Sequence, residues 1–200
     1  LPLQARAAMQ FPADFGAHRA QSIEWWYLTG LLADAKGGPP RFGYQLTFFR
    51  LPGPAAADHP SGLASRELLL GHVALSDLGA QRQRHSQRLL RALPGAVYST
   101  VGDCDLELRD WTLQRRGAGY HAAFSGPGFA VELALAAPEP PLLQGDEGIS
   151  RKGPDPAHFS HYYSRPQLAT TAVLDLDGRR QRLAGRAWLD HEWSDSVLGE

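Results

Sequence analysis

The sequence contains very little cysteine and no long hydrophobic run. Cys104 is the single cysteine among 200 residues. One cysteine cannot form an intramolecular disulfide, and without a CxxC pair it predicts neither a zinc site nor a dithiol redox site. The longest stretch without Asp, Glu, Lys or Arg covers residues 117–131 and contains Pro127. This stretch is too short and too rich in helix breakers for a transmembrane helix, so the sequence predicts none.

An excess of charge of one sign is also missing. Twenty Lys and Arg residues balance 21 Asp and Glu residues, for a formal net charge of -1. Binding to a phosphate backbone normally requires a basic surface, so this balance predicts no nucleic-acid partner. An arginine-rich run at residues 82–91 alternates with other residues, and we interpret it as one solvated face of a strand.

Several well-known catalytic motifs are absent. The chain has no G-x-S-x-G, no H-E-x-x-H, no G-x-x-x-x-G-K-[ST] and no G-x-G-x-x-G segment. Serine hydrolases, zinc proteases and nucleotide-binding proteins therefore lack their usual signal here. The chain starts at Leu1 rather than at Met, from which we expect that an upstream segment was removed; export therefore stays possible.

What the chain does contain is a series of short apolar or alternating runs separated by Gly, Pro and Asp. These runs predict an all-β protein with strands at residues 23–32, 42–51, 67–76, 82–91, 105–115, 120–124, 129–136, 159–164, 168–175 and 180–188. Strands spaced this regularly predict an up-and-down meander, which avoids exposed edges by closing into a barrel that can hold a small apolar ligand. We expect a lipocalin-like antiparallel β-barrel over residues 1–200. The segment 52–65 is expected at its rim, and the segment 139–157 is expected to cover its mouth.

The densest aromatic cluster is Glu24-Trp25-Trp26-Tyr27. Strand geometry places Glu24 and Trp26 on one face of the sheet and Trp25 and Tyr27 on the other. A carboxylate between large rings is either a functional acid or an inward-pointing member of an ion pair, because buried Glu is rare unless it is paired. The aromatic side chains by themselves favour core packing.

A second cluster, at residues 188–193, follows the last predicted strand. If the strand continues, Trp188, Asp190 and Glu192 share one face, and His191 shares the other with Trp193. Two neighbouring carboxylates repel each other, and in a dry site one of them would keep a proton. Such a carboxyl group is a candidate general acid. The alternative is a polar strand end that leads into solvent.

Histidines form the third pattern. His161 and Tyr163 share one face of the strand predicted at 159–164. His158 and His161 are three residues apart, a spacing that suits metal binding on a helix better than on a strand, so we predict no metal site. His72, alone in an apolar strand, is interpreted as a hydrogen-bonded core residue.

Five segments together resemble a known family: Phe11-Pro12-x-Asp14-x-Gly16-x-His18, Glu24-Trp25-Trp26-Tyr27-x-Thr29-Gly30, Gln45-x-Thr47-Phe48-Phe49-Arg50, Gly145-Asp146-x-Gly148-x-Ser150-Arg151-Lys152-Gly153 and Ala187-Trp188-Leu189-Asp190-His191-Glu192-Trp193-Ser194. They resemble the AttH/CrtC-like proteins, which are lipocalin-like "predicted secreted hydrolases". This family includes carotenoid 1,2-hydratase, also called hydroxyneurosporene synthase. No activated nucleophile supports the word hydrolase.

The resemblance implies two consecutive lipocalin-like barrels, of which this chain carries the first and lacks the second. The ligand cleft is then expected near the contact of the two halves, so one wall of the site would be absent here. Membership of a "secreted" family also implies a periplasmic or extracellular location.

By analogy with carotenoid 1,2-hydratase, the expected reaction is cofactor-free addition of water to a C=C bond of an acyclic isoprenoid. Asp190 is the expected proton donor, Glu24 is a second candidate acid, and His161 would position or deprotonate the water. Trp188, with Tyr163 or Trp26, would stabilise the carbocation through cation–π contacts. Further expected substrate-binding residues are Trp25, Tyr44, Phe48, His191 and Glu192. The alternative hypothesis is an exported carrier or sensor that binds a lipid or isoprenoid without chemistry.

Overall fold

The computed structural model describes residues 8–55, 59–61, 64, 66–155 and 157–195. Within these residues the regular structure is antiparallel strand, apart from the short 3-10 helix η2 (Ala13–Phe15). The strands are β1 (Ile23–Asp34), β2 (Phe42–Pro52), β3 (Glu67–Asp77), β4 (Arg82–Arg91), β5 (Val97–Ser99), β6 (Asp105–Leu108), β7 (Trp111–Arg116), β8 (Gly119–Gly126), β9 (Phe129–Ala136), β10 (Leu142–Leu143), β11 (Ile149–Arg151), β12 (Phe159–Leu176) and β13 (Arg179–Ser194).

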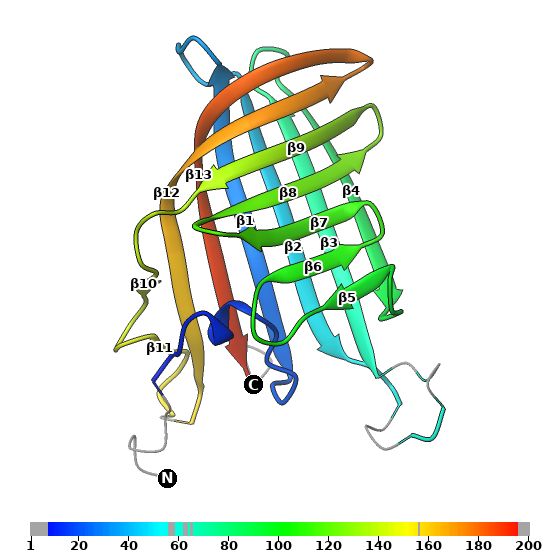
Figure 1. Cartoon of the computed structure of the whole chain (residues 1–200), viewed down its shortest axis with the longest axis vertical. Coiled ribbons are helices and arrows are strands. Elements are labelled where there is room, and N and C mark those ends of the chain that lie inside the picture. The colour runs from blue at the N-terminus through cyan, green and yellow to red at the C-terminus, as the bar shows by residue number, and fades with distance from the viewer. Residues whose placement is uncertain (1–7, 56–58, 62–63, 65, 156, 196–200) are drawn as a thin grey trace.

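The strands follow one another around a nearly closed barrel in chain order. The first strand, β1, pairs with β2 on one side and with the last strand, β13, on the other. The order along the sheet is β4-β3-β2-β1-β13-β12-β9-β8-β7-β6-β5, while β10 and β11 pair with β12. In Figure 1, β5 to β9 cross steeply over β1 to β4, and β12 and β13 curve from one layer into the other. The predicted lipocalin-like meander is confirmed.

The seam of the barrel lies between β4 and β5, the two ends of the sheet. Arginine side chains of β4 bridge it to the turns of the opposite hairpins. Arg88 pairs with Asp110 and lies 4.1 Å from the ring centroid of Trp111. Arg84 donates to both carboxylate oxygens of Asp177, at 2.6 and 2.5 Å. The run that we interpreted as a solvated strand face therefore also closes the barrel.

Two predicted strand boundaries were wrong for local reasons. The run 105–115 forms two strands, because the chain turns between them at Arg109, whose φ is 63°. The runs 159–164 and 168–175 form the single strand β12, which has a register shift between Arg165 and Leu168. Pro166 lies in this β-bulge, which accommodates a residue that cannot donate a ladder hydrogen bond.

The segment 139–157 extends the sheet along the lower half of β12. Its short strands β10 and β11, which we did not predict, pair with β12 (Figure 1). Of the predicted rim segment 52–65, residues 56–58, 62–63 and 65 lie outside the described residues.

The barrel interior is packed with side chains. Trp111, Tyr120 and Phe124 are almost completely buried between the two layers. Gly71 on β3 makes room for this packing, since an ideal Cβ there would lie 2.6 Å from Leu108 Cδ2 and 2.9 Å from Trp111 Cε3. Both distances are shorter than side chains tolerate, so the glycine lets the two layers approach closely.

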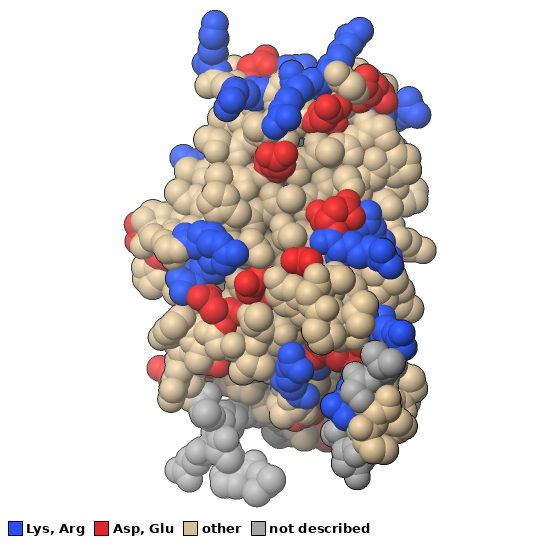
Figure 2. Space-filling model, turned by 45° about the vertical axis from the view of Figure 1, so that its right-hand side comes forward, with Lys and Arg blue, Asp and Glu red and all other residues tan. Residues whose placement is uncertain are grey.

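The described surface mixes charges of both signs. Figure 2 shows Lys and Arg side chains beside Asp and Glu side chains, at the turns and along the middle of the face in view. None of the helices in the described chain is long and apolar enough to cross a lipid bilayer.

Candidate functional site

Alternating side chains of β1 and β13 divide the sequence clusters between the two faces of the sheet. The register pairs Trp26 with His191 and Tyr27 with Asp190. Trp26 and His191 are buried toward the barrel interior, which we call the inner face, whereas Tyr27 and Asp190 are only half-buried on the outer face. This division follows the period-2 spacing of the strand residues. The site must therefore be considered one face at a time.

Asp190 lies on the outer face and has three hydrogen-bond donors on one oxygen. Its Oδ1 accepts from the Tyr162 hydroxyl at 3.0 Å, the Ser164 hydroxyl at 2.5 Å and the Trp188 indole N–H at 2.7 Å. Gln144 in turn donates to Ser164 at 2.8 Å and orients that hydroxyl. All three bonds end on Oδ1, and no described residue bonds to Oδ2.

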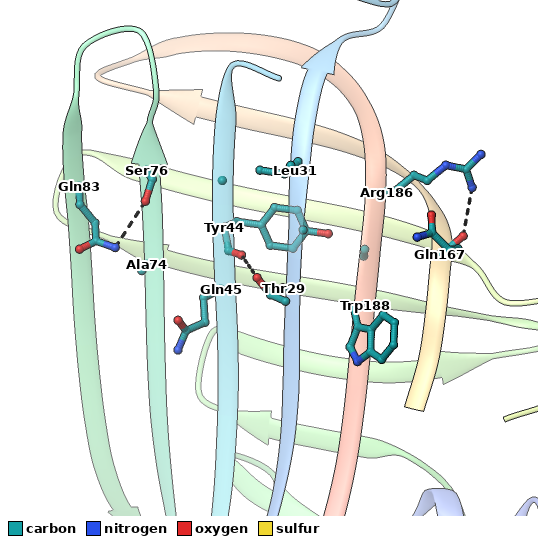
Figure 3. Close-up of a pocket in the computed structure, with 13 residues that line it drawn as sticks. Thr29, Leu31, Tyr44, Gln45, Ala74, Ser76, Gln83, Gln167, Arg186 and Trp188 are labelled. Atoms are coloured by element: carbon teal, nitrogen blue, oxygen red, sulfur yellow. Dashed lines mark hydrogen bonds between the residues drawn. The ribbon is translucent and has the colours of Figure 1, made fainter. Parts of the chain in front are cut away.

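A groove of about 430 Å³ lies on the outer face, and Asp190 is linked to it through Trp188 without lining it. Trp188 connects the two, because it lines the groove (Figure 3) and donates its N–H to Asp190. Small residues and polar side chains both line the groove, among them Gly30, Gly43, Ala74, Ala187, Thr29, Gln45, Gln167 and Arg186. Its volume lies within the range of small-molecule sites. The outer face thus places a carboxyl group beside a hollow of ligand size.

Glu192, the second carboxylate on this face, has a cationic partner. It accepts from Ser160 at 2.5 Å and pairs with Lys152 at 2.5 Å. Lys152 therefore compensates its charge, which relieves the repulsion expected between Glu192 and Asp190. No described cationic side chain pairs with Asp190.

Glu24 lies completely buried on the inner face, in an ion-pair network whose other members include the partly exposed His18. Its Oε2 accepts from Arg50 Nε at 2.7 Å, and its Oε1 bonds to His18 Nδ1 at 2.7 Å and to His191 Nε2 at 2.9 Å. Burial raises the pKa of Glu24, but the hydrogen bonds from His18 and His191 outweigh burial and lower it to about 2. Glu24 is therefore ionised near neutral pH and has no proton to donate.

Tyr163 and His191 extend this network. Burial lowers the pKa of His191 and raises that of Tyr163 well above its usual range. A neutral imidazole and a protonated phenol give one consistent assignment, in which the Tyr163 hydroxyl donates to His191 Nδ1 at 3.1 Å and His191 Nε2–H donates to Glu24. Trp26 stacks on His191 with 4.4 Å between ring centroids. These residues form a closed polar core.

Possible metal ligands come together in the same place. Ligand atoms of His18, Glu24 and His191 lie within 4.8 Å of one another. However, the Arg50 cation lies against the same carboxylate, and Glu24 Oε1 already bonds to both imidazoles. The donor set therefore suits a buried ion-pair network better than a cation site.

The expected acid, Asp190, and the expected water-positioning residue, His161, do not come together. His161 lies on the inner face, where it stacks on Trp193 with 5.3 Å between ring centroids. Asp190 points to the opposite face, as do its neighbours Tyr27 and Trp188. The physical reason is the one-residue alternation of strands, which separates Asp190 from the face that carries His161.

The other expected site residues also divide between the faces. Glu24, Trp26 and Tyr163 belong to the inner network, and Phe48 is buried in the core. Tyr44 is an inner residue that nevertheless lines the outer groove. It packs closely against Gly30, where an ideal Cβ would lie 2.6 Å from the Tyr44 hydroxyl oxygen. Trp25 lies on the outer face against Phe49.

Sequence reasoning missed three polar residues around Asp190: Tyr162, Ser164 and Gln144. Strand alternation predicts that Tyr162 and Ser164 share one face of β12. Their contact with Asp190 depends on the pairing of β12 with β13, which places Ser164 opposite Asp190. Gln144 carries no recognisable signal in the sequence.

His18 is expected to stabilise the fold more at low pH than at high pH. Burial lowers the pKa of His18, but hydrogen bonds to Asp14 and Glu24 raise it above 6.5. A raised folded-state pKa gives stability that is complete below the unfolded-state pKa and is lost as the pH rises through the folded-state pKa. We therefore expect the His18→Gln substitution to reduce the free energy of unfolding more at about pH 6 than at about pH 9, as measured by urea denaturation. An equal cost at both pH values would contradict a protonated His18.

Comparison with known proteins gives both a family and a fold. An AttH-like family profile matches residues 2–200. A crystal structure described as AttH, from Nitrosomonas europaea, is 37% identical with a TM-score of 0.83, over 99% of this chain and 59% of that chain. Kievitone hydratase from Nectria haematococca shares the fold at 11% identity and a TM-score of 0.66, over 98% of this chain and 55% of that chain. A search of curated proteins finds no match. The chain spans between half and two thirds of the length of these two structures, and it belongs to the AttH-like family.

Proposed function

We propose that this chain contributes Asp190 and the outer groove to a cofactor-free hydratase, which adds water to a C=C bond of an acyclic isoprenoid. The observation that carries the proposal is the placement of Asp190 on the outer face, where it accepts from Tyr162, Ser164 and Trp188, the last of which also lines the groove. Membership of the AttH-like family and the fold shared with a hydratase support it. The isoprenoid substrate is inferred from the resemblance to carotenoid 1,2-hydratase.

The proposed reaction needs one proton and one water molecule. The Oδ2–H of Asp190 protonates one alkene carbon, and the π electrons form the new C–H bond, which leaves a tertiary carbocation on the other carbon. The rings of Trp188 and Tyr27, on the same face as Asp190, stabilise this cation. Water then forms the C–O bond, and its surplus proton returns to the Asp190 carboxylate. The acid is regenerated, and the net change is the addition of one water.

The volume of the groove limits which part of the substrate can enter it. A volume of about 430 Å³ suits a small molecule or the end of a long chain. In a carotene, the terminal isoprene units would enter the groove while the rest of the polyene lies outside. A second lipocalin-like barrel, which we expect from the family resemblance, would then cover this outer face.

Mass spectrometry tests the proposal directly. The protein would be incubated with an acyclic carotene in detergent micelles, and the extract searched for the mass of one added water. A product supports the hydratase. No product from this chain or from a longer natural form, with carotene recovered unchanged, would contradict it. Product from the longer form alone would show that another domain completes the site.

A carrier of hydrophobic molecules is the second candidate function. The observation that favours it is the groove itself, because small lining residues such as Gly43 and Ala74 leave room for a ligand and binding requires no catalytic group. A carrier would retain an apolar compound through purification and release it with unchanged mass.

Filling the groove is expected to weaken ligand binding under either function. An ideal Cβ at Gly43 would lie 3.7 Å from Leu31 Cδ2 and 3.8 Å from Ser76 Cβ, which are ordinary contact distances. The Gly43→Leu substitution should therefore occupy the groove with little backbone strain and weaken carotene binding by about tenfold or more, as measured by tryptophan fluorescence quenching. Gly43→Ala should have a smaller effect, and Ala130→Leu, on the exposed side of β9, should have none. Unchanged binding by Gly43→Leu would place the ligand elsewhere.

A further inference from the structure

Arg165 is a buried cation without an anionic partner in the described chain. It lies at the β-bulge of β12 and is only 6% exposed. Its Nη2 donates to the backbone carbonyls of Ala137 at 2.6 Å and Glu139 at 2.8 Å. No described carboxylate lies within ion-pair distance, and three of its five N–H donors have no described partner. Buried charges are normally paired, so this arrangement calls for an anion.

A pocket of about 480 Å³ lies beside this guanidinium. We call it the Arg165 pocket. Residues of the β7–β8 turn and of the segment between β9 and β10 line it. Apolar groups make up much of its wall, including Phe15, Tyr120, Ala137 and Pro140. A ligand here would therefore place an apolar body against rings and prolines and its charged end near Arg165.

The other charges around the Arg165 pocket leave its positive charge uncompensated. Arg115 also lines the pocket, but it donates to both carboxylate oxygens of Asp103, at 2.6 and 2.7 Å. Glu139 lies exposed at the rim, and its carboxylate forms no described ion pair. The buried part of the pocket therefore carries the single positive charge of Arg165, which suits a monoanion, while the unpaired carboxylate of Glu139 lies at the solvent-exposed rim.

Two aromatic rings hold the guanidinium in place. Its carbon lies 5.5 Å from the ring centroid of Phe15 and 5.8 Å from that of Tyr120. The Tyr120 hydroxyl is buried and has no hydrogen-bond partner among the described residues. Burial raises the pKa of Tyr120, so the hydroxyl keeps its proton. Buried polar groups without partners are uncommon, and this one lies on a side chain that lines the pocket.

We propose that the Arg165 pocket binds a carboxylate with a short apolar body. The ion pair with Arg165 would supply the buried cation with its missing counter-charge, and the apolar body would cover Phe15, Tyr120 and the neighbouring prolines. This site is separate from the outer groove, because Arg165 lies on the inner face and its neighbour Ser164 on the outer face. The proposal does not depend on hydratase activity.

Isothermal titration calorimetry at neutral pH tests it with octanoate as the probe. We expect saturable octanoate binding to the wild-type protein, and binding about tenfold or more weaker in Arg165→Met, because hydrogen bonds to a charged group are lost. Arg179→Met removes an exposed arginine at the start of β13 and should bind octanoate like the wild type. Octan-1-ol has the same chain without the charge and should bind about tenfold or more weakly.

Other results would overturn the proposal. They are an absence of octanoate binding, equal octanoate binding by Arg165→Met, and equal binding of octan-1-ol. If inorganic phosphate bound as tightly as octanoate, the proposal would also be overturned, because the apolar wall would then contribute nothing to binding. If Arg165→Met does not fold, as judged by circular dichroism, the comparison of octanoate with octan-1-ol in the wild type and in Arg165→Lys decides the question.

Discussion

Replacing Glu24 with glutamine is expected to destabilise the protein by about 3–5 kcal/mol, because it leaves a buried cation without its partner. Arg50 is 2% exposed and donates to Glu24 at 2.7 Å. Glutamine keeps the size of the side chain but removes the charge, while the bonds of Arg50 to the carbonyls of His18 and Gln21 remain. Urea denaturation near neutral pH measures the difference in the free energy of unfolding.

A double variant separates the ion pair from simple packing. Removing both charges, as in Glu24→Gln with Arg50→Met, should cost less than removing Glu24 alone, since no unpaired charge then remains in the core. A Glu24→Gln protein within about 1 kcal/mol of the wild type would show that Arg50 does not need this carboxylate.

The same substitution should change the response to acid. The folded-state pKa of Glu24 is lowered from 4.5 to about 2. A lowered pKa gives stability that is present above the unfolded-state pKa and lost as the pH falls through the folded-state pKa. The wild type should therefore lose part of its stability between about pH 4.5 and pH 2, and Glu24→Gln should lack this part.

Replacing Asp190 with asparagine is expected to reduce hydration by about 10²–10⁴-fold, because an amide cannot supply the proton. The fold should survive, since an amide oxygen can still accept from Tyr162, Ser164 and Trp188. The initial rate of water addition to the carotene, followed by mass spectrometry, measures the effect, and circular dichroism checks the fold. Full turnover in this variant would remove Asp190 from the mechanism.

A His161→Gln variant tests whether a residue on the inner face takes part in the reaction, and it is the control for Asp190→Asn. The sequence hypothesis assigns His161 to the attacking water, but its half-buried ring stacks on Trp193 on the inner face. The geometry therefore predicts turnover close to that of the wild type in His161→Gln. A loss as large as that of Asp190→Asn would restore a role for His161 in the reaction.

Much of the fold could be predicted because strand signals are local. Alternating residues and turn formers in the sequence were enough to expect the barrel and most of its strands. The same alternation correctly separated Trp26 and His191 from Tyr27 and Asp190, because neighbouring side chains of a strand point to opposite faces. The short strands β10 and β11 were missed, because two or three residues are too few to show an alternating pattern. These strands form by pairing with β12.

The candidate site shows where this local reasoning ends. The sequence pattern made both Glu24 and Asp190 candidate acids. The structure distinguishes them by the side chains that each carboxyl group contacts. Glu24 bonds to His191, which is 167 residues away in the chain, and to Arg50, which is 26 residues away. These contacts keep Glu24 ionised in the interior, whereas Asp190 receives only neutral donors on the outer face.

The sequence by itself therefore determined the fold class, the family resemblance and the face on which each strand residue lies. Tertiary structure decided which charges are compensated: Lys152 for Glu192, Arg50 for Glu24, and no described partner for Arg165. The physical reason is that alternation is a property of one strand, while the environment of a charge depends on the register of strands that are distant in the chain.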